Sequence, residues 1–149
     1  MPALSPILVA VDGSACSGRA VERAAELAER IGGSIILLHC HRVPAELEGI
    51  ARHYATGVEY ERSIRAQLEA ESRAMLHDLA AGLRARGLDI AMESRAGEAG
   101  PTIVAAGTEL AAAWVFVGTR GRTAVKRLLL GSVATYVVHH ADRPVVVVP

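Results

Sequence analysis

Short apolar runs alternate with longer segments of helical periodicity along most of this chain. The first run, residues 7–11, is continuous, partly β-branched and closed by the polar segment 12–14, as is typical of a strand buried on both faces. In residues 17–31 apolar side chains recur at every third or fourth position, and the glycines at 32–33 supply a stop signal. The pattern therefore predicts a strand followed by an amphipathic helix.

The same alternation continues to the end of the chain. It predicts further strands at 34–40, 88–95, 113–117 and 144–148, and further helices at 58–86, 101–110 and 132–140. Residues 42–57 mix Pro, Gly, His and charge without a period, and we predict a loop, with at most a short helical turn, that lies beside the ligand site. The third strand alternates apolar with charged residues, which favours an edge position.

Alternating strands and helices imply crossover connections. The fold class is therefore α/β, an open five-stranded parallel sheet with helices on both faces. Ligands of such sheets bind beyond the carboxyl ends of the strands, where the strand order reverses. We expect functional residues in 12–17, around Cys40 and in 118–132.

Composition narrows the choice of partners. The 149 residues suffice for one domain, 1–149, and 16 basic residues balance 16 acidic ones, which argues against nucleic acid or an anionic membrane as a partner. No apolar run approaches the roughly 18 residues of a membrane span, and the N-terminus does not resemble a signal peptide. We therefore expect a cytoplasmic location, and in that reducing compartment Cys16 and Cys40, which form no C-x-x-C pair, are expected as free thiols.

The segment after the fourth strand carries the strongest signal for chemistry. Gly118 and Gly121 permit the close backbone approach that a phosphate-wrapping loop needs, and Gly131–Ser132 opens the next helix, whose N-terminus favours an anion. Four cations lie in this loop: Arg120, Arg122, Lys126 and Arg127. From spacing alone, phosphate binding and a solvated basic turn both stay open.

Asp12, at the end of the first strand, also has two readings. It caps a turn or the following helix, or it faces a ligand. Ser14 and Ser17 are available as caps, so we favour the ligand.

Enzymatic signatures are weak. The patterns G-x-x-x-x-G-K-[S/T] and G-x-G-x-x-G do not occur, and the loop carries no carboxylate to orient a water molecule. The pairs His39/His41 and His139/His140 have no third ligand at a convincing spacing, so we expect no metal site in them. We therefore assign no catalytic residue, and we expect at most slow hydrolysis of any phosphate compound that the loop binds.

The chain resembles the universal stress protein family over essentially its whole length. The resemblance rests on the segments 7–14, 37–39, 117–121, 131–134 and 144–148, and above all on the G-x-x-G-x₉-G-[S/T] loop of the family's ATP-binding branch. It implies a Rossmann-like sheet, similar to the adenine nucleotide alpha hydrolases, with strand order 3-2-1-4-5. Two positions depart from the family pattern: Ala134 replaces a frequent hydroxyl residue, which weakens phosphate binding, and Ala112–Ala113 replace an acidic residue.

The resemblance also implies a role for each site residue. Asp12 would meet the ribose or a nucleotide-bound Mg²⁺, and the Cys40 backbone would bond the adenine edge. The nucleoside would contact Ala10 and Val11; the ribose and phosphates would border Val117, Gly118, Gly121 and Arg122; and the phosphate chain would be held by Gly131, Ser132 and Val133. The ligand would be ATP, AMP or cyclic AMP.

The apolar terminal strand, residues 145–148, predicts a partner. As an unpaired edge it would be an aggregation hazard, which antiparallel pairing with a second copy removes, and the resemblance implies such a homodimer. We therefore expect a dimeric adenine-nucleotide sensor or switch of the stress response. The alternative is a dimeric interaction or chaperone-like module that binds no nucleotide.

Overall fold

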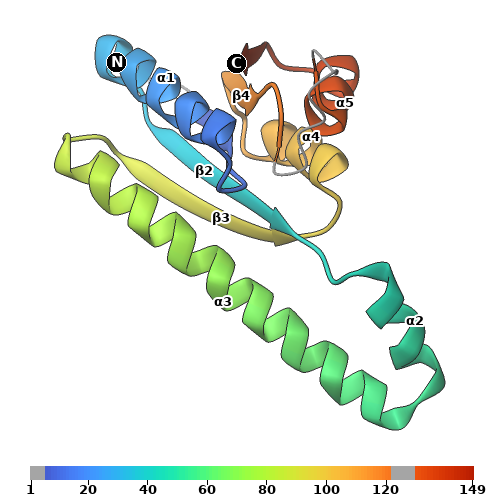
Figure 1. Cartoon of the computed structure of the whole chain (residues 1–149). Coiled ribbons are helices and arrows are strands. Elements are labelled where there is room, and N and C mark those ends of the chain that lie inside the picture. Colours follow the sequence, from blue (N-terminus) through green and yellow to red (C-terminus); the bar gives the residue numbers. More distant parts are fainter. Residues whose placement is uncertain (1–5, 122–129) are drawn as a thin grey trace.

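The chain folds around one parallel five-stranded sheet (Figure 1). The structure, a computed structural model, describes residues 6–121 and 130–149. Its elements are β1 (Ile7–Ala10), α1 (Ala15–Ile31), β2 (Ile35–His41), α2 (Ala45–His53), α3 (Ala55–Ala85), β3 (Ile90–Ala96), α4 (Ala99–Glu109), β4 (Trp114–Gly118), α5 (Ser132–His140) and β5 (Val145–Val148). The strand order is β3-β2-β1-β4-β5, which confirms the predicted α/β class and order.

Strand β1 lies at the centre of the sheet, and its register sets that of both neighbours. Ile7 is paired with Ile35 of β2 on one side and with Trp114 of β4 on the other. All pairings are parallel, so the carboxyl ends of the strands meet at one edge. Strands β3 and β5 lie at the two ends of the order, as the sequence pattern predicts.

Two apolar layers hold the sheet between helices. Helices α1 and α3 cover one face, where Val9, Leu37 and Leu76 are buried together. Helices α4 and α5 cover the other face around Leu8 and Leu38. Alternate residues of β1 and β4 are buried in opposite layers, which is why these inner strands are continuous apolar runs in the sequence.

The ends of α1 follow from local chemistry. The Ser14 hydroxyl accepts the Ser17 N–H at 3.2 Å and caps the helix, which therefore begins at Ala15, two residues before the predicted start. At the other end Gly32 has φ = 69°, a left-handed conformation that glycine adopts without strain, and its N–H bonds to the Ala28 carbonyl. The predicted glycine stop is confirmed.

The loop prediction for residues 42–57 is wrong. Nine of these residues form α2, and α3 begins at Ala55 rather than at 58. The sequence of α2 shows no clear helical period of apolar residues, because the helix is short and buries only Ala51. Acidic residues in its first turn and basic residues in its last turn favour the helix through its dipole.

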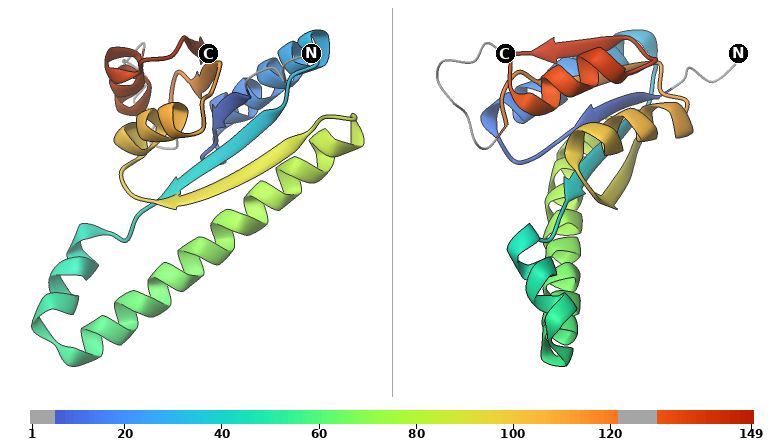
Figure 2. Two further views of the ribbon diagram at one scale, coloured as in Figure 1. Left: turned by 180° about the vertical axis from the view of Figure 1, so that it is seen from behind. Right: turned by 90° about the vertical axis from the view of Figure 1, so that its right-hand side faces the viewer.

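Helix α3 therefore extends well past the sheet that it covers. Its 31 residues span roughly 46 Å at 1.5 Å per residue, whereas the 7 residues of β3 span roughly 23 Å. Figure 2 shows α2 and the first half of α3 as a helical hairpin that projects away from the sheet. In the ranges that the structure describes, no helix is both long and apolar enough to cross a membrane.

Candidate functional site

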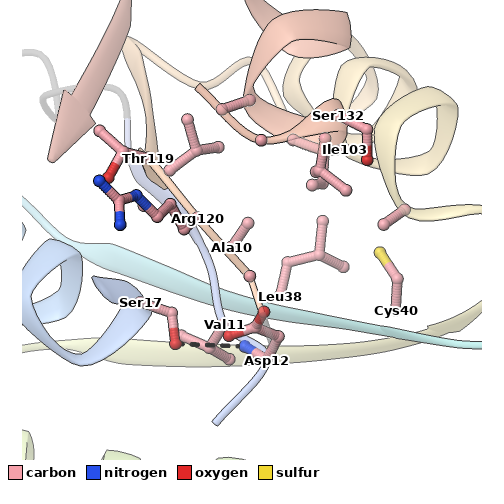
Figure 3. A pocket seen from close by; sticks show the side chains of 17 residues that line it. Ala10, Val11, Asp12, Ser17, Leu38, Cys40, Ile103, Thr119, Arg120 and Ser132 are labelled. Carbon is pink, nitrogen blue, oxygen red and sulfur yellow. Dashed lines mark hydrogen bonds between the residues drawn. The ribbon is translucent and has the colours of Figure 1, made fainter. Parts of the chain in front are cut away.

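A cavity of about 290 Å³ opens at the carboxyl ends of β1, β2 and β4 (Figure 3). This is near the lower end of the range for small-molecule sites, about 300–1,000 Å³. Its walls are mainly apolar, and it is lined by Ala10, Val11, Asp12, Ser17, Leu38, Cys40, Ala99, Ile103, Val117, Gly118, Thr119, Arg120, Gly121, Gly131, Ser132, Val133 and Ala134. Ten of the eleven residues predicted to bind nucleotide therefore line one cavity, and the eleventh, Arg122, lies outside the described residues.

The topology explains the position of this cavity. The chain runs outward from β1 through β2 to β3, then returns to place β4 on the other side of β1. Crossovers on the two sides of this reversal leave a crevice between the ends of β1 and β4, where ligands of such sheets bind. Ala10 and Val117 reach the cavity from the two strands concerned.

The glycine-bearing segment brings the main chain close to the cavity. The Gly131 N–H donates to the Thr119 carbonyl at 2.6 Å, and a Cβ on Gly131 would lie 3.2 Å from that oxygen. A Cβ on Gly118 would lie 2.8 Å from the Cβ of Cys16 in α1. Both glycines thus allow approaches that any side chain would obstruct.

Helix α5 begins at the cavity wall. Gly131 is its N-cap residue and Ser132 its first residue, as predicted. The first N–H groups of any α-helix have no acceptor within the helix, and they lie at the positive end of its dipole. With the Ser132 hydroxyl, this end of the cavity offers hydrogen-bond donors to an anion.

Asp12 forms a local turn and also borders the cavity. Its Oδ1 accepts the Ser14 N–H at 2.9 Å, which forms a local turn, while Ser14 itself caps α1. The carboxylate also borders the cavity, because a Cβ on Gly121 would lie 2.9 Å from its Oδ2. Among the described lining residues Asp12 is the one acid and Arg120 the one base.

Seven further lining residues received no individual binding role from the resemblance, although Ser17, Thr119 and Arg120 lie in segments that were expected to be functional. They are Ser17, Leu38, Ala99, Ile103, Thr119, Arg120 and Ala134. Ala99 and Ile103 come from α4, which packing brings over the end of β2, and no motif marks them. Ala134 of α5, one of the departures from the family pattern, is 2% exposed and packs into the apolar layer between α4, α5 and the sheet.

Cys40 lies on the wall with these apolar side chains. In Figure 3 its thiol and the Arg120 guanidinium lie toward opposite sides of the cavity. Burial raises the pKa of the Cys40 thiol to about 11, although the nearby Arg95 charge partly opposes this effect. The thiol is therefore neutral at physiological pH and contributes an uncharged surface.

We expect the folded chain to protect Cys40 from alkylation. A higher pKa lowers the thiolate fraction far more than it raises nucleophilicity, so Cys40 should react with iodoacetamide at pH 8 at least about tenfold more slowly than in the urea-denatured chain. Timed quenching and peptide mass spectrometry measure both rates. Equal rates in the folded and denatured chain would contradict the buried, neutral thiol.

The histidines of β2 face away from the cavity. His39 Nδ1 lies 2.8 Å from the Ser72 hydroxyl, and His41 Nε2 bonds to the carboxylate of Glu69, both residues of α3. Partial burial raises the pKa of Glu69, but hydrogen bonds from Ser94, His41 and Arg73 outweigh it and hold that pKa below the usual value. These imidazoles join the sheet to α3.

The other histidine pair is engaged within α5. His139 Nδ1 and His140 Nδ1 each lie 2.8 Å from the main-chain carbonyl four residues earlier. Within residues 6–121 and 130–149, no three His, Cys, Asp or Glu side chains come together as a set of metal ligands.

Comparison with known proteins yields a consistent set of matches. The model of the universal stress protein family matches residues 4–149. A universal stress protein of Mycolicibacterium smegmatis is 36% identical over 144 residues, covering 95% of this chain and 47% of that protein. The chain thus spans about half the length of this relative.

Solved structures share the fold. Hypothetical protein MJ0577 matches with a TM-score of 0.84 and 23% identity, covering 97% of this chain and 94% of the other. A universal stress protein in complex with cAMP matches with a TM-score of 0.70 and 24% identity, covering 98% of this chain and 97% of the other. A universal stress protein family protein of Arabidopsis thaliana with AMP bound matches with a TM-score of 0.68 and 22% identity, covering 97% of this chain and 90% of the other.

Proposed function

Because the chain belongs to the universal stress protein family, we propose that its cavity is an adenine-nucleotide site and that the protein works as a dimeric sensor or switch. Two structural neighbours hold cAMP and AMP, which supports a nucleotide as the ligand. The observation that carries the proposal is the convergence, in one cavity, of the three glycines Gly118, Gly121 and Gly131 with the N-terminus of α5.

The lining of the cavity suits the two parts of a nucleotide. Leu38, Cys40 and Ile103 offer an uncharged, apolar surface of the kind that a base prefers. Ser132 and the first N–H groups of α5 offer donors that suit phosphate oxygens. Arg120 adds a positive charge on the wall.

We further propose that the nucleotide is ATP and that it carries a Mg²⁺ ion. Mg²⁺ prefers oxygen ligands and commonly takes one or two carboxylates together with phosphate oxygens and water. Asp12 supplies one carboxylate at the cavity wall, so the described residues fit an ion carried by the nucleotide phosphates. Asp12 would hold either that ion or the ribose, and the ion would neutralise phosphate charge.

We propose that nucleotide turnover is slow. The cavity has no His or Glu in its described lining, and Asp12 already accepts a main-chain hydrogen bond, so little is available to orient a water molecule for attack. A saturated ATPase assay should give a kcat below roughly 1 per second, the lower end for kinases. A faster rate that Asp12→Ala abolishes would show an enzyme instead.

The proposed homodimer forms through β5. This strand has one neighbour, β4, so the main-chain groups of its outer side face no other strand in the described part of the chain. An antiparallel second copy of β5 would satisfy them. A cytoplasmic location stays a prediction of the sequence.

Mass spectrometry of small molecules released from the purified, denatured chain tests the ligand class. We expect an adenine nucleotide. A guanine nucleotide or a dinucleotide at stoichiometric amount would contradict the assignment. The alternative module, without nucleotide, is supported by Ala134, since that position places an apolar methyl group on the cavity wall.

A further inference from the structure

Ser17 is a polar residue on the wall of the proposed nucleotide cavity. It lies in the first turn of α1, and only 5% of it is exposed. In the part of the chain that the structure describes, Ser17 and Ser72 are the two buried polar residues. A buried hydroxyl is costly unless it is hydrogen-bonded, so the partners of Ser17 indicate what the residue does at this wall.

The hydrogen bonds of Ser17 connect it to the segment that follows β1. Its hydroxyl donates to the Ser14 carbonyl at 3.0 Å. The same oxygen accepts the Asp12 N–H at 3.3 Å, the contact drawn as a dashed line in Figure 3. A serine hydroxyl has one proton to donate, and that proton is already engaged within the protein. Ser17 therefore holds Asp12 and has no donor left to offer a ligand.

This set of hydrogen bonds orients the Asp12 carboxylate. The Ser14 N–H donates to Asp12 Oδ1 at 2.9 Å, while Ser17 holds the N–H of Asp12 itself. Gly13 has φ = 79°, a left-handed conformation that lets the chain turn tightly between them. The second oxygen, Oδ2, is the one near Gly121 on the cavity wall, where a Cβ would lie 2.9 Å from it. Oδ2 is thus the Asp12 oxygen that is presented to a ligand.

We propose that Ser17 is a positioning residue, which holds Asp12 so that Oδ2 meets a ribose hydroxyl or a nucleotide-bound Mg²⁺. Both contacts use one carboxylate oxygen, which accepts a hydrogen bond from the hydroxyl or coordinates the ion. This role rests on the proposed function, because it needs a nucleotide in the cavity. Without the Ser17 hydroxyl the Asp12 N–H loses its acceptor, and the carboxylate gains freedom that ligand binding must then remove.

Hydrogen exchange in the nucleotide-free chain tests the contact itself. In Ser17→Ala the Asp12 amide should exchange with solvent at least about tenfold faster than in wild type, as measured by NMR, because its acceptor is gone. The matched control is Ser72→Ala, which removes the other buried hydroxyl, one that contacts His39 and Ser94 outside the cavity. The control should leave the Asp12 amide unchanged. An Asp12 exchange rate in Ser17→Ala equal to that of wild type overturns the proposal, whether or not a nucleotide binds.

Calorimetric titration tests the effect on the ligand, with AMP in EDTA and with ATP in Mg²⁺. Because the bond at 3.3 Å is long, we expect a moderate loss of affinity in Ser17→Ala, about fivefold with at least one of the two ligands. A loss with AMP in EDTA assigns Oδ2 to the ribose, and a loss confined to ATP with Mg²⁺ assigns it to the ion. Ser72→Ala should bind both ligands as wild type does.

An Asp12→Asn background separates positioning from a general loss of structure. Asparagine keeps an oxygen for the Ser14 N–H and replaces Oδ2 with an amide nitrogen, which neither accepts a hydrogen bond nor coordinates Mg²⁺. Adding Ser17→Ala to Asp12→Asn should change the affinity by less than about twofold. A full fivefold loss in that background, or no loss in Ser17→Ala alone from a chain whose wild type binds, overturns the positioning role and leaves the proposed function intact. A wild-type chain that binds neither ligand would contradict the proposed function and this role with it.

Discussion

Gly131→Glu should abolish nucleotide binding, with the affinity for ATP and AMP falling at least about a hundredfold, or roughly 2.7 kcal/mol. The new Cβ would lie 3.2 Å from the Thr119 carbonyl oxygen, a tight contact that requires this carbonyl to move by a few tenths of an ångström. The new carboxylate would also stand at the N-terminus of α5, where it competes with the phosphates for the same donors. Titration calorimetry on the variant measures the loss.

Gly82→Glu is the matched control for this change. Gly82 lies in α3 with open space where a Cβ would stand, and it lies away from the cavity, so the same substitution should preserve both fold and affinity. Circular dichroism on both variants separates lost binding from lost structure. A folded Gly131→Glu chain that binds nucleotide within about threefold of wild type would refute the proposed phosphate site.

Val147→Pro should dissociate the proposed β5 dimer while the fold persists. The carbonyls of Pro144 and Val148 accept hydrogen bonds from the β4 side, so by strand alternation the N–H of Val147 points to the outer edge. Proline removes that donor and blocks an incoming strand, yet it is tolerated on an edge strand. The dimer dissociation constant should rise at least about a hundredfold in sedimentation equilibrium.

The control for this variant is Val147→Ala, which trims the side chain but keeps the N–H. It should stay dimeric, because the outer main-chain groups are intact. A more drastic change, deletion of residues 144–149, should give monomers or insoluble protein, since it also removes the buried Val148 and the Arg19 bond to Pro149. A Val147→Pro chain that stays as dimeric as wild type would place the interface elsewhere.

Strands β1, β4 and β5 were predictable because each is a continuous apolar run, and β3 was predictable from its alternation of apolar and polar residues at a sheet edge. The cavity-lining segments were predictable for a related reason: in a parallel sheet the residues after each strand converge, so Asp12, Cys40 and Gly118 meet although they are far apart in sequence. Glycine spacing and the start of α5 at Ser132 then located the loop.

Other features could not be read from the sequence. Helix α2 is short and buries one residue, so it leaves no periodic signal that would predict a helix. Ile103 and Ala99 reach the cavity through packing of α4 on the sheet, which no local pattern encodes. Ser14, and not Ser17, caps α1. The sequence alone does not distinguish the two serines, because both are suitable capping residues and only the backbone geometry decides which one caps the helix.

Calorimetric titration of the wild-type chain with ATP, AMP and cyclic AMP tests the central claim most directly. The cavity between β1 and β4, with its apolar lining and its helix N-terminus, should bind at least one of these nucleotides at one site per chain. A saturable heat with that stoichiometry is the predicted result. No binding heat with any of the three, from a chain shown to be folded and free of carried nucleotide, would contradict the adenine-nucleotide site.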